Sequence, residues 1–250
     1  MWNSNKESEG ISMNEYYKIN AGKIRKTNEK YLSFIKKELC DLTGREYPAL
    51  CDEIWKYYEE NMLEYFPYIG GDKVSGTKNL TGSFGFVAMG EILKGYGVPL
   101  REIGHLMALS YERNTLAMPS LVRKLMHKIF TSPGLLNKMF QKKDISNAEN
   151  ARINPGSFET KTVIPPEDGY IFSYHNLVCP LSNFAKAYGY EEYMPYLCNL
   201  DYVMYGVLGV PLYREHTCFE DGDCCDFKVK AGTETLDYWP PVFEQGKGYK

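Results

Sequence analysis

Apolar residues recur at helical spacing up to about residue 147. From Asn14 to Leu39 they are interspersed with many lysines, which predicts a long helix with one solvated face. A second helix is predicted from Pro48 to Leu63. NLTGSFGFVAMGEILKGYGVP predicts a central helix, since its apolar residues cover more than one face and Thr81 suits an N-cap. Further helices are predicted at residues 100–116 and 120–130 and, as a short helix, after Pro133.

The pattern changes after residue 147. FETKTVIPP and GYIFSYHNL are rich in β-branched and aromatic residues and are bounded by NPGS and PPEDG, which predicts two antiparallel strands. Helices are predicted at residues 180–187 and 194–208. PLYREHTCF and CDFKVKA then predict a hairpin that places Cys218 and Cys225 on its strands, with Gly222 supplying the turn conformation.

This order of elements predicts an α+β fold, in which a helical N-terminal half packs on a small antiparallel sheet with two further helices. Residues 1–13 are polar and are expected to form a disordered tail. The helical region is expected at residues 14–147 and the α+β region at residues 148–250. We expect the two regions to pack together as one domain.

Composition narrows the classes of partner. The net charge is −3, so no basic excess indicates a nucleic-acid partner. The N-terminal residues lack the apolar core of a signal peptide, and no run approaches the roughly 18 apolar residues of a membrane span. We therefore expect a cytoplasmic protein without a membrane partner. The 21 tyrosines suit a pocket for a small molecule, although a tyrosine-rich core would have the same composition, and a homo-oligomer is left open.

The seven cysteines are expected to be reduced, because cytoplasmic thiols stay reduced and an odd number does not complete a disulfide framework. Three of them lie in the stretch CFEDGDCCDF. No Cys-x-x-Cys pair occurs, and adjacent Cys224 and Cys225 cannot easily supply two tetrahedral ligands, so no metal and no cofactor is predicted. Metal binding remains the minority alternative, with these candidate ligands: Cys179, Cys198, Cys218, Cys224, Cys225, His175 and His216.

The C-terminal third carries an ordered set of cysteine and aspartate elements. Cys179 follows a predicted strand, Cys198 and Asp201 form a Leu-Cys-x-x-Asp element, Thr217 precedes the hairpin turn, and GDCCDF opens the last strand. As an ordered set they resemble the family of L-2-amino-thiazoline-4-carboxylic acid hydrolases. The resemblance covers roughly residues 67–230, with PYIGGDK and FTSPGLL matching the helical half.

The chain departs from that family pattern at three places. HNLVC has no charged residue just before its cysteine, Cys218 stands where an aliphatic residue is common, and Cys224 lies beside Cys225. These departures bear on the exact substrate more than on the fold. The domain is accordingly expected to be hydrolase-like, with the thiazoline as a representative substrate.

The resemblance implies a hydrolase that acts on a carbon–nitrogen bond of a small cyclic amidine-like substrate. The family reaction opens 2-amino-thiazoline-4-carboxylate to a carbamoyl-cysteine. Two alternatives stay open. One is a non-catalytic sensor domain of the 4-vinyl-reductase type that binds a small molecule or a metal. The other is a biosynthetic family member that acts on a larger sulfur-containing intermediate.

Four residues are the candidates for catalysis. Cys179 ranks first because it precedes Pro180 at a helix start, where backbone N–H groups stabilise a thiolate, and His175 lies close enough in sequence to share the pocket. Asp201 and Cys198 are three residues apart in an apolar helix and share one face, so Asp201 is the preferred general base or amidinium partner. The alternatives are that Cys179 is a buried apolar residue and that Asp201 faces solvent or pairs with a buried arginine.

Five residues are the candidates for substrate binding. Cys225 and Asp226 lie on opposite faces of the last strand, so the hairpin either closes the pocket or packs only as structure. Arg214, Lys78 and the helix N-terminus near Thr81 are the candidates for binding a substrate carboxylate, and the sequence does not choose among them. The full predicted set is Thr217, Cys225, Asp226, Arg214 and Tyr205.

Overall fold

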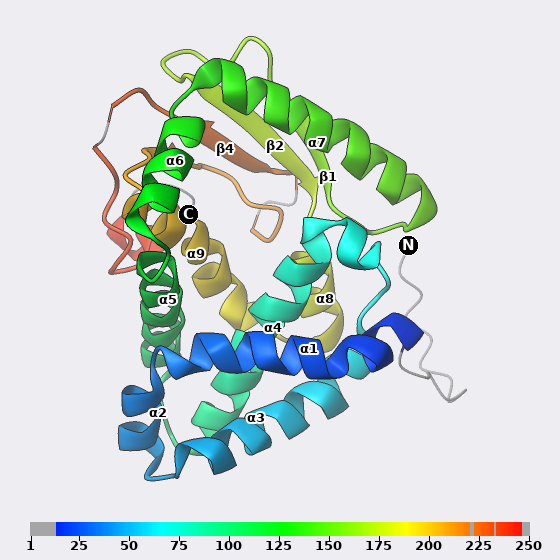
Figure 1. The fold of residues 1–250 in the computed structure, drawn as a ribbon, viewed down its shortest axis with the longest axis vertical. Coiled ribbons are helices and arrows are strands. Elements are labelled where there is room, and N and C mark those ends of the chain that lie inside the picture. The colour runs from blue at the N-terminus through cyan, green and yellow to red at the C-terminus, as the bar shows by residue number, and fades with distance from the viewer. Residues whose placement is uncertain (1–13, 221–222, 233, 247–250) are drawn as a thin grey trace.

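The computed structural model describes residues 14–220, 223–232 and 234–246, and the predicted tail at residues 1–13 lies outside them. The predicted α+β class is confirmed (Figure 1). The helices are α1 (Glu15–Ser33), α2 (Lys36–Thr43), α3 (Tyr47–Asn61), α4 (Ser75–Gly95), α5 (Leu100–Leu116), α6 (Ser120–Phe130), α7 (Pro133–Ile153), α8 (Pro180–Tyr188) and α9 (Met194–Val207). The strands are β1 (Glu159–Thr162), β2 (Phe172–Val178), β3 (Leu212–Tyr213) and β4 (Cys225–Val229).

The helix predicted from Asn14 to Leu39 is divided into α1 and α2. The break falls at Phe34 and Ile35, and it allows both Ile35 and Leu39 to be fully buried in the helical core. The carbonyl of Phe34 accepts a hydrogen bond of 2.6 Å from Nη1 of Arg113. Tertiary packing and this side chain therefore end a helix that the sequence pattern would continue.

Helix α4 begins earlier than predicted. Its first residue is Ser75, and Thr81 lies inside the helix, where its hydroxyl donates to the carbonyl of Thr77 at 3.0 Å instead of capping. Glycines usually disfavour a helix interior. Here Gly76 lies so close to the Phe158 ring that a Cβ would be 2.5 Å from Cδ2, which shows why the glycine-rich stretch suits a helix packed on all sides.

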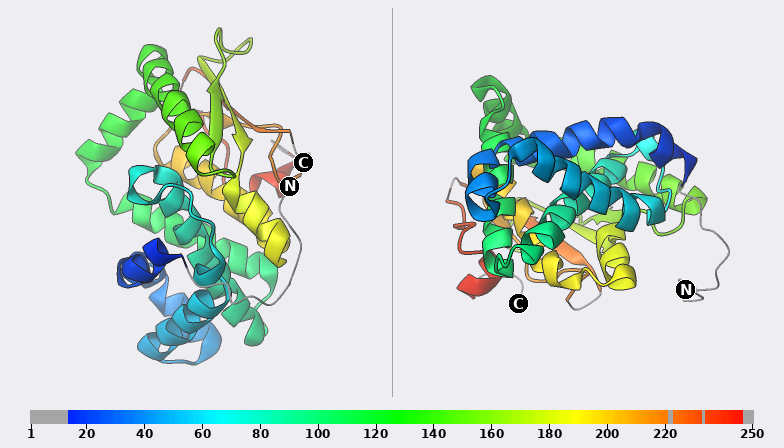
Figure 2. Two further views of the ribbon diagram at one scale, coloured as in Figure 1. Left: turned by 90° about the vertical axis from the view of Figure 1, so that its right-hand side faces the viewer. Right: turned by 90° about the horizontal axis from the view of Figure 1, so that it is seen from below.

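The sheet is antiparallel with the strand order β1-β2-β4-β3. Tyr174 pairs with Phe227 and Asn176 with Cys225, so these side chains point to the face that meets the helices. His175 pairs with Asp226 on the opposite face. Helix α7 lies along β1 and extends across the sheet (Figure 2). It is a long helix that ends at Ile153, beyond the short one predicted after Pro133.

The predicted C-terminal hairpin is only partly formed. Strand β3 ends at Tyr213, so Cys218 lies in the connecting loop and not on a strand, while Gly222 lies outside the described residues. The N–H groups of Glu215 and His216 donate to Oδ1 of Asp226 at 2.9 and 2.6 Å. Because this carboxylate takes N–H groups that a longer strand would use, regular pairing ends after β3, although the carbonyl of His216 still accepts a hydrogen bond of 3.4 Å from the N–H of Asp226.

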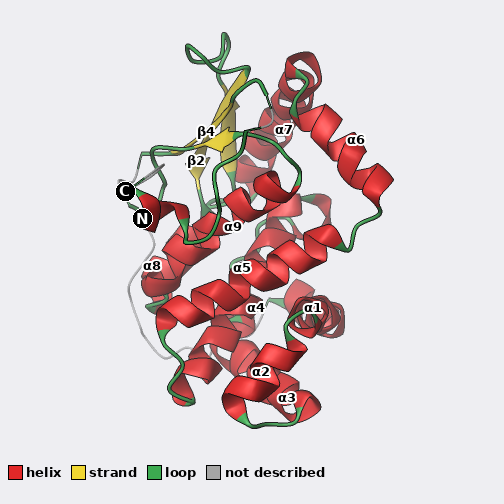
Figure 3. Cartoon of the chain, turned by 90° about the vertical axis from the view of Figure 1, so that its left-hand side faces the viewer, coloured by secondary structure: helices red, strands yellow, loops and turns green. Residues whose placement is uncertain are grey.

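Two hydrophobic clusters build the molecule, one among α1, α3, α4 and α5 and one between the sheet and α7 and α9. Figure 3 shows the strands at one end and α1 to α3 at the other, with α4, α5 and α9 between them. Cys198 and Tyr238 pack against both clusters. Among the described residues, no helix is long and apolar enough to cross a membrane.

The contact between α5 and α9 depends on a glycine. A Cβ at Gly104 would overlap the base of the Tyr196 ring. We expect Gly104→Ala to lower the free energy of unfolding by about 1–3 kcal/mol through overpacking, as measured by urea denaturation. Gly22→Ala in α1 is the matched control, because nothing lies within 4 Å of its new Cβ. Equal stability of the two variants would contradict this account of the contact.

Candidate active site

A cavity of about 420 Å³ lies between the two halves of the molecule. Its walls come from α1, α4 and α5 on one side and from the sheet, α7 and α9 on the other. A volume of this size accommodates a small organic ligand. We call five of its lining residues the reactive end: Cys179, Cys198, Asp201, Arg214 and Cys225.

Local structure explains how the reactive end forms. Cys179 is the N-cap residue of α8 directly after β2, and Pro180 occupies the first turn as predicted. Cys198 and Asp201 lie on α9 and face the cavity together, as their spacing predicts. Cys225 is the first residue of β4. Its side chain points to the cavity face of the sheet, opposite that of Asp226.

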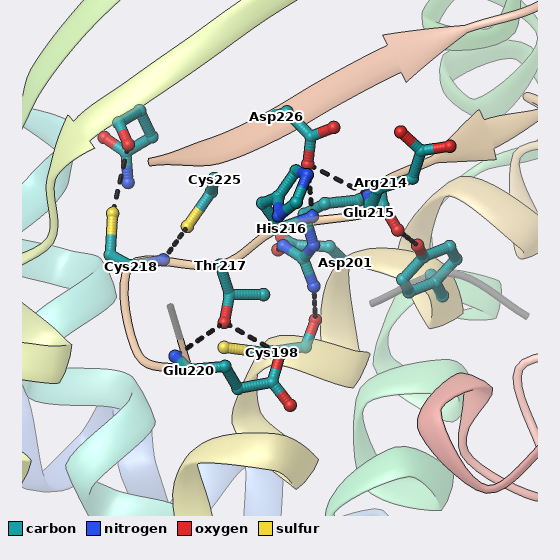
Figure 4. Close-up of polar contacts among 12 residues, drawn as sticks. Cys198, Asp201, Arg214, Glu215, His216, Thr217, Cys218, Glu220, Cys225 and Asp226 are labelled. Atoms are coloured by element: carbon teal, nitrogen blue, oxygen red, sulfur yellow. Dashed lines mark hydrogen bonds and ion pairs between the residues drawn. The ribbon is translucent and has the colours of Figure 1, made fainter. Parts of the chain in front are cut away.

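Asp201 is paired with a buried arginine (Figure 4). Nη1 of Arg214 donates to Oδ2 of Asp201 at 2.9 Å, and Nη2 donates to the carbonyl of Cys198 at 2.8 Å. Arg214 is 1% exposed, whereas the Asp201 side chain is 39% exposed and lines the cavity. The guanidinium also lies 4.8 Å from the centroid of the Phe227 ring. The predicted alternative of a partner arginine is therefore present, and it holds the carboxylate at the cavity wall.

The surroundings of Asp201 alter its acidity. Burial raises the pKa of the Asp201 carboxyl, and the charge and hydrogen bond of Arg214 oppose this without cancelling it. A raised pKa makes the carboxylate a stronger base and its acid form a more available proton donor near neutral pH. Asp201 is therefore suited to move a proton in either direction.

The surroundings of Cys179 favour the alternative of a buried, protonated thiol over a thiolate. Burial raises the pKa of the Cys179 thiol to about 12, even though the backbone N–H groups of Leu181 and Ser182 favour the thiolate. Burial also raises the pKa of Cys198 well above its usual value. The helix N-terminus is present as predicted, but in this apolar position desolvation outweighs it.

Cys225 has the opposite shift. Hydrogen bonding from Cys218 and the positive charge of Arg214 lower the pKa of the Cys225 thiol to about 7, although burial acts against them. The backbone N–H of Cys218 donates to Sγ of Cys225 at 3.3 Å, and Sγ of Cys218 donates to the carbonyl of Asn176 at 3.0 Å (Figure 4). The departure from the family pattern at Cys218 thus coincides with the neighbour that stabilises the thiolate.

His175 does not share the cavity, and that prediction is wrong. It lies on the opposite face of β2 from Tyr174 and Asn176, which line the cavity. Its Nε2 lies 3.5 Å from Oε1 of Glu167. Strand alternation decides this placement, because neighbouring residues on β2 point to opposite faces.

Three predicted binding residues lie outside the cavity lining and contact other parts of the protein. Asp226 is buried on the outer face, where Oδ2 lies 2.9 Å from Nζ of Lys228. The Thr217 hydroxyl donates to Oε2 of Glu220 at 3.1 Å, and the buried Tyr205 ring packs edge-on against Phe130. None of these three belongs to the described lining of the cavity, so direct substrate contact is not their role in this geometry.

The sequence reasoning missed Lys143. This α7 residue lines the cavity and interacts electrostatically with Asp201, and burial lowers the pKa of its ammonium group. It lies in QKKD, a polar run in which nothing distinguishes one lysine from the next. Only the position of α7 over the sheet shows that the Lys143 side chain reaches the reactive end.

A group of metal-binding side chains lies outside the cavity. Ligand atoms of Glu215, His216 and Asp226 lie within 4.8 Å of one another. However, Nζ of Lys228 already lies 2.9 Å from Oε2 of Glu215 and 2.9 Å from Oδ2 of Asp226. An ammonium group thus neutralises the carboxylates that a cation would need, and the group gives no reason to assign a metal.

One comparison with known proteins bears on this arrangement. Residues 115–229 match the family model described as L-2-amino-thiazoline-4-carboxylic acid hydrolase. The predicted resemblance to this family is confirmed. No curated protein and no solved structure matches the chain. The match to the thiazoline hydrolase family includes the whole reactive end, whereas α1 and α4, which build the facing wall, lie outside it.

Alkylation at different pH values tests the assignment of the thiolate. We expect iodoacetamide to modify Cys225 faster than Cys179 at neutral pH, because only the deprotonated sulfur reacts and the pKa of Cys225 is lowered. Cys179 should require a much higher pH. Peptide mass mapping of partly modified protein distinguishes them. Faster modification of Cys179 at neutral pH would reverse the assignment, and Cys225→Ser should remove the fast phase.

Proposed function

We propose that the protein is a hydrolase that opens a small cyclic amidine bearing a carboxylate, with 2-amino-thiazoline-4-carboxylate as the representative substrate. The observation that carries this proposal is the thiol of lowered pKa, Cys225, in the same cavity as the Asp201–Arg214 pair. A nucleophile and a proton-transferring carboxyl group are together sufficient to hydrolyse an amidine through a covalent adduct. The family description supports the same class of reaction.

The first step uses Cys225 as nucleophile. Its thiolate attacks the ring carbon between nitrogen and sulfur of the protonated amidine, and a new carbon–sulfur bond forms as the amidinium charge is neutralised. The carboxylic acid form of Asp201 then gives its proton to the ring nitrogen. The ring carbon–nitrogen bond breaks and the nitrogen leaves as an amine. The former ring carbon stays bonded to Sγ of Cys225, to the substrate sulfur and to the exocyclic nitrogen, as an iminodithiocarbonate.

The second step uses water and the same carboxylate. Asp201, now ionised, takes a proton from a water molecule as its oxygen bonds to the adduct carbon. The bond to Sγ of Cys225 then breaks as the new hydroxyl becomes a carbonyl, and the hydroxyl proton passes to the amine freed in the first step. This releases a carbamoyl-cysteine and restores the thiolate. Arg214 keeps Asp201 at the cavity wall through both steps. The raised pKa of Asp201 suits a group that alternates between acid and base.

The substrate carboxylate requires a cation other than Arg214. Both terminal nitrogens of Arg214 already donate, one to Asp201 and one to the carbonyl of Cys198. Lys143 lines the same cavity from α7 and takes part in no ion pair among the described residues. We assign the carboxylate contact to Lys143, in place of the contact predicted for Arg214.

The test is turnover of 2-amino-thiazoline-4-carboxylate by the full-length protein, followed by mass spectrometry. A carbamoyl-cysteine with a new primary amine is expected, because the proposal breaks the ring carbon–nitrogen bond. A new free thiol would instead show that the ring carbon–sulfur bond breaks, and would correct that step. Saturable binding without any turnover would sink the hydrolase proposal and favour the sensor alternative.

A further inference from the structure

A second hollow of about 270 Å³ adjoins the cavity. It is formed where the start of α4 faces the middle of α7. Ser75, Lys143 and Asn147 line both spaces, so the hollow and the cavity share a wall. The remaining lining residues of the hollow are Lys73, Val74, Met139, Lys142 and Ser146.

Positive charge gathers around this hollow. Lys73, Lys142 and Lys143 line it, and Lys78 lines the adjacent cavity. None of these four takes part in an ion pair within the part of the chain that the structure describes. Like charges held together repel one another, and an anion bound among them removes that cost.

The neighbouring carboxylates form no ion pair with these lysines among the described residues, although Asp144 attracts Lys143 and Asp72 attracts Lys78 electrostatically. Asp72 accepts hydrogen bonds from Nζ of Lys23 at 3.0 Å and from the hydroxyl of Tyr16 at 3.1 Å. Asp144 accepts hydrogen bonds from the hydroxyls of Thr160 and Thr162 at 2.7 and 2.6 Å. Both acids are held by other partners, although each lies next in sequence to one of the lysines. Lys73 and Lys142 in particular form no ion pair within the described part of the chain, so their ammonium groups are available to a ligand.

The cavity is also larger than the representative substrate requires. A single small ring with one carboxylate occupies only part of about 420 Å³, a volume typical of sites for larger ligands. The side of the cavity away from the sheet presents aromatic surface from Tyr31, Phe86 and Tyr111. All three aromatic residues lie outside residues 115–229, the part of the chain that matches the family model. Of the helices that carry them, only the last residues of α5 lie inside the match.

We infer that the substrate is a larger conjugate whose reacting ring lies at Cys225 and whose anionic group, a phosphate or a second carboxylate, is bound by Lys73 and Lys142 in the adjoining hollow. This inference rests on the proposed hydrolase function of the same cavity. The aromatic wall then contacts the part of the substrate between the ring and the anionic group. Lys73 and Lys142 become specificity-determining residues that distinguish the conjugate from the free thiazoline.

Direct binding of two probe anions tests the hollow. Pyrophosphate and malonate are titrated into the full-length protein by calorimetry at one fixed ionic strength, since screening alone alters such binding. We expect at least one of them to bind, and the tighter one identifies the anionic group as phosphate or carboxylate. The double variant Lys73→Gln/Lys142→Gln should weaken that binding about tenfold or more. Lys56→Gln, an exposed change on α3, is the matched control and should bind as the wild type does.

The same titration on Cys225→Ser separates this inference from the proposed function. The subsite is supported if Cys225→Ser binds the anion as the wild type does and the Lys73→Gln/Lys142→Gln variant does not. This holds whether or not the free thiazoline is hydrolysed. Absence of binding by both anions, or binding that the double variant leaves intact, overturns the inference. In that case turnover of the free thiazoline would still stand as evidence for the hydrolase proposal.

Discussion

Replacing Cys225 with serine is expected to lower kcat for opening of 2-amino-thiazoline-4-carboxylate by about 10³-fold or more. A serine hydroxyl is almost wholly protonated at neutral pH, whereas hydrogen bonding from Cys218 and the charge of Arg214 lower the pKa of the Cys225 thiol to about 7. The variant keeps a small polar side chain at the start of β4, so the sheet should form normally. Initial rates with purified protein, beside a circular dichroism spectrum, measure the effect.

Cys179→Ser and Cys198→Ser are the matched controls for this experiment. Each removes a thiol that lines the same cavity but is protonated at neutral pH, because burial raises its pKa. We expect each control to retain turnover within about tenfold of the wild type, an effect of less than about 1.4 kcal/mol on the barrier. Loss of activity in Cys179→Ser with retention in Cys225→Ser would return the role of nucleophile to Cys179.

Local periodicity accounts for the parts of the fold and site that the sequence predicts well. The change from helical to alternating spacing after residue 147 indicates the α+β class, and the spacing of Cys198 and Asp201 places both on one face of α9. The relation of Cys225 to Asp226 follows from strand alternation in the same way. Each of these features depends only on residues close together in the chain.

Other features depend on contacts between distant segments. The break between α1 and α2 requires Arg113 of α5, and Lys143 reaches the reactive end only because α7 lies over the sheet. The orientation of His175 did have a signal, since the large residues Phe172 and Tyr174 at alternate positions indicate the buried face of β2. His175 directly follows Tyr174 on the strand and therefore points away from that face.

The acidities of the thiols could not be read from motifs. A helix N-terminus stabilises a thiolate by a modest amount, whereas burial in an apolar cavity opposes it by more. Cys179 lies at a helix N-terminus, but the effect of burial on its pKa is larger. Cys225 has no helix terminus, yet a neighbouring cysteine and a buried arginine from other parts of the chain overcome its burial.

Removing the guanidinium of Arg214 is expected to destabilise the fold strongly. Arg214→Met should lower the free energy of unfolding by about 3 kcal/mol, the lower end of the range for breaking a buried pair, because the Asp201 side chain is 39% exposed to the cavity. Asp201→Leu should cost a similar amount, since it leaves the charge of Arg214 buried without its carboxylate. The double variant Asp201→Leu/Arg214→Met should cost much less than the two changes added together. Urea denaturation of all four proteins measures this coupling.

The pH dependence of the same proteins gives a sharper test. In Arg214→Met the charge and the hydrogen bond of Arg214 are lost and only Lys143 still opposes burial, so the pKa of Asp201 rises further above its unfolded value. Between those two pKa values the folded state binds more protons than the unfolded state, and stability therefore falls as pH rises through that interval. The double variant has no carboxyl group at this position and should lack this dependence. If Arg214→Met and the double variant had the same pH profile, Asp201 would not be a buried carboxylate held by Arg214, and its assignment as the proton-transferring group would fail with it.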